Sequence, residues 1–155
     1  AVERASGRAT SIKWPNDVLL AGGKVAGVLA EGRADGVVLG LGLNVNQTPS
    51  ELPRRPYVPA TSLRAADGLE RDLASLLADL LACLEARYDA WSAGGLAAVH
   101  ADLAARDALR GRRVHAGDRV GVALGIDLDG RLELATTEGA VAIASGEVSV
   151  EPLSG

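Results

Sequence analysis

Large aromatic side chains and sulfur are scarce in this chain of 155 residues. It contains no phenylalanine and no methionine, with only two tryptophans, two tyrosines and one cysteine. The hydrophobic core must therefore be built mainly from aliphatic side chains. The single cysteine, Cys83, excludes an internal disulfide, and its place on an apolar helical stripe predicts a small, inert core residue.

Signals for export, membrane insertion and nucleic-acid binding are also lacking. No apolar run is long enough to cross a membrane and no signal-peptide pattern is present, so we expect a cytoplasmic protein without a membrane partner. The formal net charge is −4 and the isoelectric point is about 5.2, unlike the basic footprint of a nucleic-acid-binding protein. The one basic cluster, Arg110, Arg112 and Arg113, is too short to change that interpretation.

The sequence also lacks the patterns of a metal site and of a nucleophilic triad. His100 and His115 lie in separate regions with no cysteine or carboxylate at ligand spacing, so no protein metal site is predicted. No serine has the Gly-x-Ser-x-Gly context of an activated nucleophile. Glu31 and Asp35 are interpreted as solvated charges near a loop rather than as a catalytic pair.

Lysine is rare, because Lys13 and Lys24 are the only two in the chain and every other basic residue is arginine. An ammonium is a compact charge on a flexible stem, whereas a guanidinium is a planar fork. The two lysines therefore indicate a place where a small, movable charge is needed. The alternative is chance clustering of a rare residue.

The first third of the chain reads as short strands joined by tight turns. Strands are predicted at 10–14, 18–20 and 24–31, with a hairpin turn at Gly22-Gly23 between the last two. Residues 36–43 are almost continuously apolar, which predicts a strand buried on both faces.

Helices are predicted in the middle of the chain. Four prolines mark 44–62 as a loop. Leucines then recur at spacings of three and four from Leu73, which predicts a long helix towards Trp91, ended by Gly94-Gly95. A shorter helix is predicted from Leu96 to about Asp107.

The pattern changes again after Arg110. Alternating apolar residues and turn dipeptides such as Asp129-Gly130 predict about five short strands in the last part of the chain. So small a sheet must wrap to bury its apolar face, which favours a small barrel. We therefore expect an α+β protein, with a mixed or antiparallel sheet and flanking helices over 1–107 and a barrel over 108–155.

Four features that could carry chemistry converge before residue 47. Asn16 and Asp17 project an amide and a carboxylate from a turn, and Lys24 lies near the predicted hairpin. Gly27 interrupts a strand, where a missing side chain marks a bulge or the close approach of another group. The fourth feature is a glycine-punctuated strand end followed by amides that could read a purine edge: Gly40, Gly42, Asn44 and Asn46.

Taken together, these segments resemble the biotin protein ligases (biotin–acetyl-CoA-carboxylase ligases). The resemblance covers nearly all of the chain, and its most specific run is Lys13-Trp14-Pro15-Asn16-Asp17. Other matching runs are Lys24 to Glu31, Gly40 to Asn46, Ala60 to Leu63, and Gly125 to Gly130. It implies a fold like that of biotin ligases and class II aminoacyl-tRNA synthetases, N-terminally incomplete, followed by an SH3-like barrel.

The resemblance also implies a reaction and its participants. Such enzymes join biotin to ATP, giving biotinyl-5′-AMP and pyrophosphate, and then transfer biotin to a lysine of a biotin carboxyl carrier protein. Lys24 and Asp17 would be catalytic, Lys24 also contacting biotin, and Mg²⁺ would accompany ATP. A homodimer is compatible with the family. The remaining implied residues fall into two groups: Gly27, Leu29, Gly40 and Gly42 for biotin, and Asn16, Asn44 and Lys13 for the nucleotide.

One departure from the family lies at the start of the chain. Nothing in residues 1–10 matches the family's Gly-Arg-rich loop that folds over the adenylate, so we expect the C-terminal portion of a ligase. The alternatives are a lipoate-type acyl ligase or transferase and a non-catalytic binding or dimerisation module.

Overall fold

The computed structural model describes residues 1–54 and 58–151. Residues 55–57, within the loop predicted at 44–62, and residues 152–155 lie outside the described part. The chain divides into two compact units, one formed by 1–11 and 16–84 and the other by 12–15 and 85–155. The predicted boundary after residue 107 stays a prediction.

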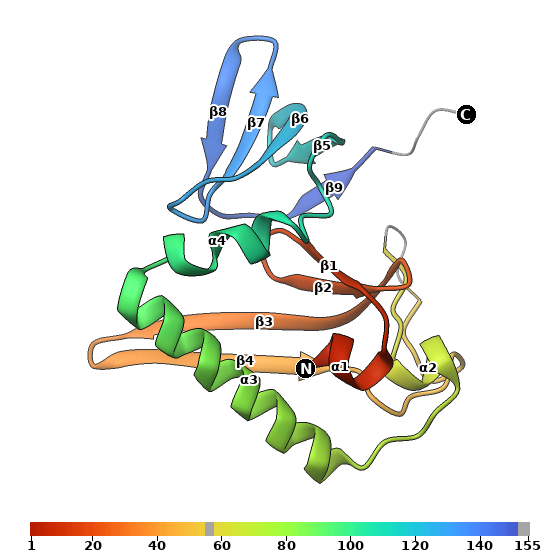
Figure 1. Cartoon of the computed structure of the whole chain (residues 1–155). Helices are drawn as coiled ribbons and strands as arrows, with labels where there is room; N and C mark the ends of the chain where they lie inside the picture. The colour runs from red at the N-terminus through yellow and green to blue at the C-terminus, as the bar shows by residue number, and fades with distance from the viewer. Residues whose placement is uncertain (55–57, 152–155) are drawn as a thin grey trace. The chain divides into compact units, whose positions relative to one another are not determined.

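The first unit is built around antiparallel strands. Its elements are helix α1 (Val2–Ser6), strands β2 (Asp17–Leu20), β3 (Gly23–Arg33) and β4 (Gly36–Leu43), and helix α2 (Leu63–Asp67). With β1 (Thr10–Lys13), the strands form a sheet in the order β1-β2-β3-β4. Figure 1 shows the long hairpin of β3 and β4. The α+β class with an antiparallel sheet is confirmed, and the sequence analysis did not predict α1 or α2.

The core of the first unit lies on one face of this sheet and is aliphatic. Its buried side chains are Leu20, Val25, Val45, Leu63 and Leu76. A core without large aromatics was expected from composition, and here it is confirmed. Cys83 is not part of it. That prediction is wrong, because Cys83 is only half-buried and its Sγ accepts a hydrogen bond from the guanidinium of Arg4.

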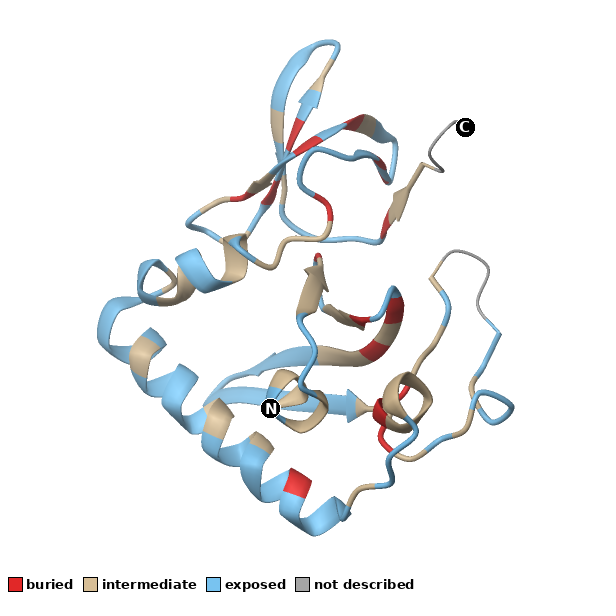
Figure 2. Cartoon of the chain, turned by 45° about the vertical axis from the view of Figure 1, so that its right-hand side comes forward, coloured by how far each residue is buried: buried red, intermediate tan, exposed pale blue. Residues whose placement is uncertain are grey.

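The prediction that 36–43 is buried on both faces is also wrong. β4 is an edge strand that pairs with β3, and its residues from Gly36 to Gly42 are exposed. Val37 keeps 65% of its surface exposed and Leu29, on β3, keeps 57%. Figure 2 shows the exposed colour along β4 and along the part of β3 next to the turn. An apolar run shows that a strand can be buried, but the elements packed on it decide whether it is.

The hairpin between β2 and β3 turns one residue earlier than predicted. Ala21 and Gly22 form the turn, with φ of 50° and 79°, and Gly23 already belongs to β3. Two successive residues with positive φ are typical of the turn that suits the twist of a two-residue hairpin. Gly23 is therefore glycine for another reason, which the contacts around Lys24 reveal.

Helix α3 (Leu73–Gly94) confirms the predicted leucine periodicity, and α4 (Ala97–Ala104) is shorter than predicted. The leucine spacing did not predict which side chains of α3 are buried. Only Leu76 is buried on α3, and the most exposed apolar side chains on this helix are Leu73, Leu77, Leu81, Tyr88 and Trp91. No helix in the described part of the chain is long and apolar enough to span a membrane.

The second unit contains an all-antiparallel sheet in the order β8-β7-β6-β5-β9. The strands are β5 (Arg113–Ala116), β6 (Arg119–Ile126), β7 (Leu132–Thr136), β8 (Gly139–Ile143) and β9 (Val148–Val150). The predicted number of strands is confirmed. The order leaves β8 and β9 at opposite ends, so among the described residues the sheet is not closed. The SH3-like barrel stays a prediction.

Trp14 belongs to the core of this second unit. It is 4% exposed, packs in the cluster that includes Leu132 and Leu134, and donates a hydrogen bond from Nε1 to the carbonyl of Gly130 at 2.9 Å. The tryptophan of the most specific sequence run is therefore a packing residue with its one polar atom satisfied. Pro15, which follows it, has a cis peptide bond.

Candidate active site

Lys24 and Asp17 form an ion pair on the face of the sheet opposite the core. Asp17 is the first residue of β2, Lys24 is near the start of β3, and the Lys24 ammonium contacts Oδ1 of Asp17. The two side chains are 26% and 15% exposed. A carboxylate oxygen shielded from water to this degree needs a cation or a donor, and Lys24 supplies it.

A β-bulge at Val25 explains why Lys24 points at Asp17. Leu19 pairs with Lys24 and Val18 pairs with Ala26, so β3 has one extra residue, Val25, at this point. Val25 is fully buried, and Ala26 also packs against the core. A bulge re-aims the side chains beside it. Because Val25 and Ala26 both face the core, the flanking Lys24 comes to the opposite face.

Gly27 lies beneath this ion pair. It is directly opposite Asp17 on one side and Gly42 on the other. A Cβ on Gly27 would lie 3.4 Å from Nζ of Lys24 and 3.8 Å from Oδ1 of Asp17. The missing side chain therefore leaves room for the lysine to lie across the strand.

Gly27, Leu29, Gly40 and Gly42 form a continuous strip on the same face. Directly opposite residues of an antiparallel pair share a face, as do residues two apart on one strand. Gly27 pairs with Gly42, and Leu29 pairs with Gly40, whose Cβ position lies 3.8 Å from Cβ of Leu29. The structure thus brings four predicted biotin-site residues together beside Lys24 and Asp17, with mostly bare backbone.

A second segment, Pro59 to Thr61, holds the backbone of Lys24, and we call it the strap. The Lys24 N–H donates to the carbonyl of Pro59 at 2.8 Å, and the Thr61 N–H donates to the carbonyl of Lys24 at 2.9 Å. Ala60 forms a parallel bridge with Lys24. The sequence analysis missed this role of the strap, since no local pattern signals pairing between such distant segments.

Asn44 is connected to both the strap and β3. Its Nδ2 donates to the carbonyl of Thr61 at 2.9 Å, and its backbone N–H donates to the carbonyl of Val25 at 2.9 Å. Asn16, by contrast, is exposed, and its carbonyl accepts a hydrogen bond from the N–H of Val28. Asn44 is therefore fixed beside Lys24, whereas the Asn16 side chain is exposed at the edge of the turn.

Lys13 belongs to a different compact unit of the chain from Asp17 and Lys24. Residues 12–15 belong to the second unit, and no ion pair of Lys13 occurs among the residues that the structure describes.

Asn46 is separate from the site. Its amide binds the backbone of Arg71 at both ends, with Nδ2 to O at 2.8 Å and N to Oδ1 at 2.9 Å, so it cannot use the same atoms to read a purine.

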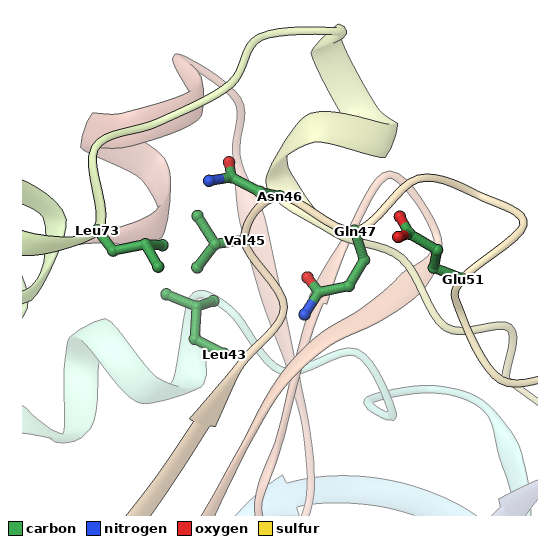
Figure 3. A pocket seen from close by; sticks show the side chains of 6 residues that line it. All are labelled: Leu43, Val45, Asn46, Gln47, Glu51 and Leu73. Carbon is green, nitrogen blue, oxygen red and sulfur yellow. The ribbon is translucent and has the colours of Figure 1, made fainter.

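A pocket of about 380 Å³ lies near the end of β4, and none of the predicted catalytic residues lines it. Figure 3 shows its lining, formed by Leu43, Val45, Asn46, Gln47, Glu51 and Leu73. Across residues 1–54 and 58–151 no cluster of three or more histidine, cysteine or acidic side chains could hold a metal ion.

Two family models match the chain. One, described as the biotin/lipoate A/B protein ligase family, matches residues 2–46, which include Asp17, Lys24 and Asn44. The other, described as the biotin protein ligase C terminal domain, matches residues 111–150. Both the N-terminal and the C-terminal part of the chain therefore match models of ligase families.

Curated relatives extend the likeness along the chain. The bifunctional ligase/repressor BirA of Bacillus subtilis is 36% identical, with 96% of this chain and 49% of the relative covered. The biotin–[acetyl-CoA-carboxylase] ligase of Mycobacterium tuberculosis is 41% identical over 90% of this chain and 52% of its own length. The chain therefore spans about half the length of these relatives.

Solved structures give the same likeness in three dimensions. A biotin protein ligase from Aquifex aeolicus matches with a TM-score of 0.88 at 29% identity, covering 97% of this chain and 69% of the other. The same enzyme in complex with biotin and ATP matches with a TM-score of 0.84, covering 97% and 65%.

Proposed function

Because this chain belongs to the biotin protein ligase family, we propose that its protein is an ATP-dependent ligase that attaches biotin to a protein lysine. The carboxylate of biotin would attack the α-phosphorus of ATP, giving biotinyl-5′-AMP and pyrophosphate. The amine of the acceptor lysine would then attack the biotinyl carbonyl and release AMP. The observation that carries this proposal is the Lys24–Asp17 pair beside a glycine-lined strip.

Lys24 would stabilise charge in the first step. Negative charge is shared between the attacking carboxylate, the phosphoryl oxygens and the leaving pyrophosphate, and a positioned cation stabilises such a transition state. The strap fixes the lysine backbone, while the four-carbon stem lets the ammonium follow the charge. Its side chain is 26% exposed, so a ligand can reach it.

Asp17 would act in two ways. Its contact with Lys24 holds the ammonium over Gly27 before substrates bind. Once Lys24 turns to the phosphate, the freed carboxylate could orient the acceptor amine and accept its proton as the amide bond forms.

The surrounding residues suit the two substrates. The strip of Gly27, Leu29, Gly40 and Gly42 would pack against the rings of biotin, because bare backbone and one leucine leave a flat apolar surface. Asn44 and Asn16 would hold the nucleotide, and we assign Lys13 to the phosphates. Mg²⁺ would be held mainly by the phosphates of ATP and by water, since this ion needs few protein ligands when it binds with a nucleotide.

The proposed partner is a biotin carboxyl carrier protein, which presents the acceptor lysine. We also propose that the protein forms a homodimer and is cytoplasmic. No contact with nucleic acid is proposed for this segment, whose net charge is −4.

The test is pyrophosphate release by the purified protein. We expect release only when biotin and ATP are both present, and we expect Lys24→Arg to lower its rate about 100-fold, because a rigid guanidinium cannot follow the developing charge. Arg33→Lys, at the far end of β3, is the control and should keep the wild-type rate. Wild-type turnover by Lys24→Arg would refute the role given to the ammonium.

A lipoate-type ligase is the second candidate, because one matching family model is described by both substrates. The match of residues 111–150 to a biotin ligase C-terminal domain favours biotin. Competition decides between them: excess lipoate should leave biotin-dependent pyrophosphate release unchanged. A calorimetric titration with biotinyl-5′-AMP separates a biotin ligase from a non-catalytic module, which should bind none.

A further inference from the structure

We infer that Gly23 is a positioning residue, which sets how closely the strap lies against β3 and thereby places Lys24 and Asn44 together. The effect of Gly23 on enzyme activity rests on the proposed function. The effect of Gly23 on the position of the strap does not, because the contacts around Gly23 are all made within the chain.

Space, and not backbone freedom, requires glycine at position 23. The positive φ values of the hairpin belong to Ala21 and Gly22, so the conformation of Gly23 is open to other residues. A Cβ on Gly23 would lie 2.8 Å from Cβ of Thr61, 3.0 Å from its Cγ2 and 3.2 Å from the carbonyl oxygen of Pro59. The first distance is too short for two carbon atoms, so any side chain at this position must push the strap away.

The strap connects two predicted substrate-binding residues. Its Pro59 carbonyl and Thr61 N–H bind the backbone of Lys24 on the side away from β2, and the Thr61 carbonyl binds Nδ2 of Asn44. Thr61 therefore bonds to Lys24 with its N–H and to Asn44 with its carbonyl. A displacement of the strap would loosen both connections at once.

Gly32 offers a matched control on the same strand. It has no positive φ, and a Cβ there would have no neighbour within 4 Å. Gly23→Ala and Gly32→Ala therefore make the same chemical change in β3, one with a clash and one without.

The experiment is amide hydrogen exchange followed by NMR on the whole chain. We expect Gly23→Ala to speed exchange of the Lys24 and Thr61 N–H groups and of the Asn44 side-chain amide at least tenfold, while Gly32→Ala leaves all three unchanged. Unchanged exchange in Gly23→Ala would overturn the inference.

A second substitution separates positioning from general destabilisation. Thr61→Gly removes the Cβ and Cγ2 atoms that the methyl group added by Gly23→Ala would meet, so the double variant Gly23→Ala/Thr61→Gly should recover slow exchange at Lys24 and Asn44. This arm also applies if Gly23→Ala alone does not fold. Failure of the double variant to recover the protection would overturn the inference.

Activity provides the last readout. Gly23→Ala should lower kcat through Lys24 and raise KM for ATP through Asn44, each about tenfold, and the double variant should reverse both. If the wild-type protein released no pyrophosphate, the proposed function would fail, whereas the exchange data would still decide the role of Gly23.

Discussion

At the scale of single residues, the site depends on where side chains are absent. Gly27 leaves room below the Lys24 ammonium, and Gly23 leaves room for Thr61. The two glycines flank a short stretch of β3 whose other residues face the core or carry the charge. Glycine usually weakens a strand interior because it adds no packing. Here that cost is offset by the close approach of a lysine and of a second backbone segment.

Substitution at Gly27 tests the room left for Lys24. A methyl group would lie at van der Waals contact, 3.4 Å from Nζ, so Gly27→Ala should lower the rate of pyrophosphate release only a few-fold. The branched side chain of Gly27→Val would overlap the lysine, and we expect a loss of about 100-fold. Gly32→Val is the control on the same strand. Equal rates for Gly27→Val and wild type, measured at saturating biotin and ATP, would contradict this account.

At the scale of elements, Arg71 joins helices α1 and α2. Its guanidinium donates to the carbonyl of Ala5 in α1 at 2.9 Å and pairs with Asp67 at the end of α2. Its backbone binds Asn46, so the segment after β4 is attached to the same residue. Two helices of five residues each are too short to be stable alone, and these bonds help to fix them.

The Asp67–Arg71 pair predicts a pH dependence of stability. The Arg71 guanidinium, and then the N–H of Leu69, lower the pKa of Asp67 from 3.8 to about 2. A carboxyl group with a lower pKa in the folded state stabilises that state above its unfolded pKa, and the stabilisation is lost as the pH falls. The free energy of unfolding should therefore decline between about pH 4 and pH 2.

Asp67→Asn should remove this part of the decline, as measured by urea unfolding at several pH values. Asp79→Asn, at an exposed position of α3, should keep the wild-type slope. An unchanged slope in Asp67→Asn would show that other carboxyl groups dominate the acid range.

Local sequence patterns predict helices and turns, whereas contacts between distant segments do not follow from the sequence. The helix periodicity from Leu73 and the turn dipeptide Asp129-Gly130 are local, and both predictions are confirmed. The pairing of the strap at Pro59 to Thr61 with Lys24 could not be predicted, because the two segments are more than thirty residues apart in the sequence. Resemblance to a family identified Lys24 and Asp17, but only the structure shows their contact and the bulge that produces it.

At the scale of the whole molecule, the chain exposes much of its apolar surface. Val37, Leu39 and Leu41 alternate along β4 and share one face, and each is more than 40% exposed. Figure 2 shows that α3 is likewise mostly exposed. A long, apolar edge strand is a template for unwanted pairing, and large apolar patches favour association.

Charged residues on β4 should therefore reduce self-association. We expect Val37→Lys/Leu39→Lys to lower concentration-dependent light scattering several-fold while changing the melting temperature by only a few degrees, because these side chains are exposed. Asp35→Lys, in the neighbouring turn, controls for the change in net charge. Equal scattering by the β4 variant and wild type would exclude this surface as the cause.

The extra residue at Val25 also decides which face of the sheet the Lys24 side chain occupies. Side chains alternate along a regular strand, so Lys24 and Gly27, an odd number of positions apart, would face opposite sides. Val25 brings them to the same side by adding one residue that the partner strand does not match. A single-residue deletion at Val25 would leave Lys24 and Gly27 two positions apart, so a regular strand would still place both on the face of Asp17. Its cost would be the loss of a fully buried core side chain. In a library of deletions, loss of Val25 alone should therefore lower stability yet keep Lys24 beside Asp17, whereas loss of one further residue between Lys24 and Gly27 should turn Lys24 to the core face.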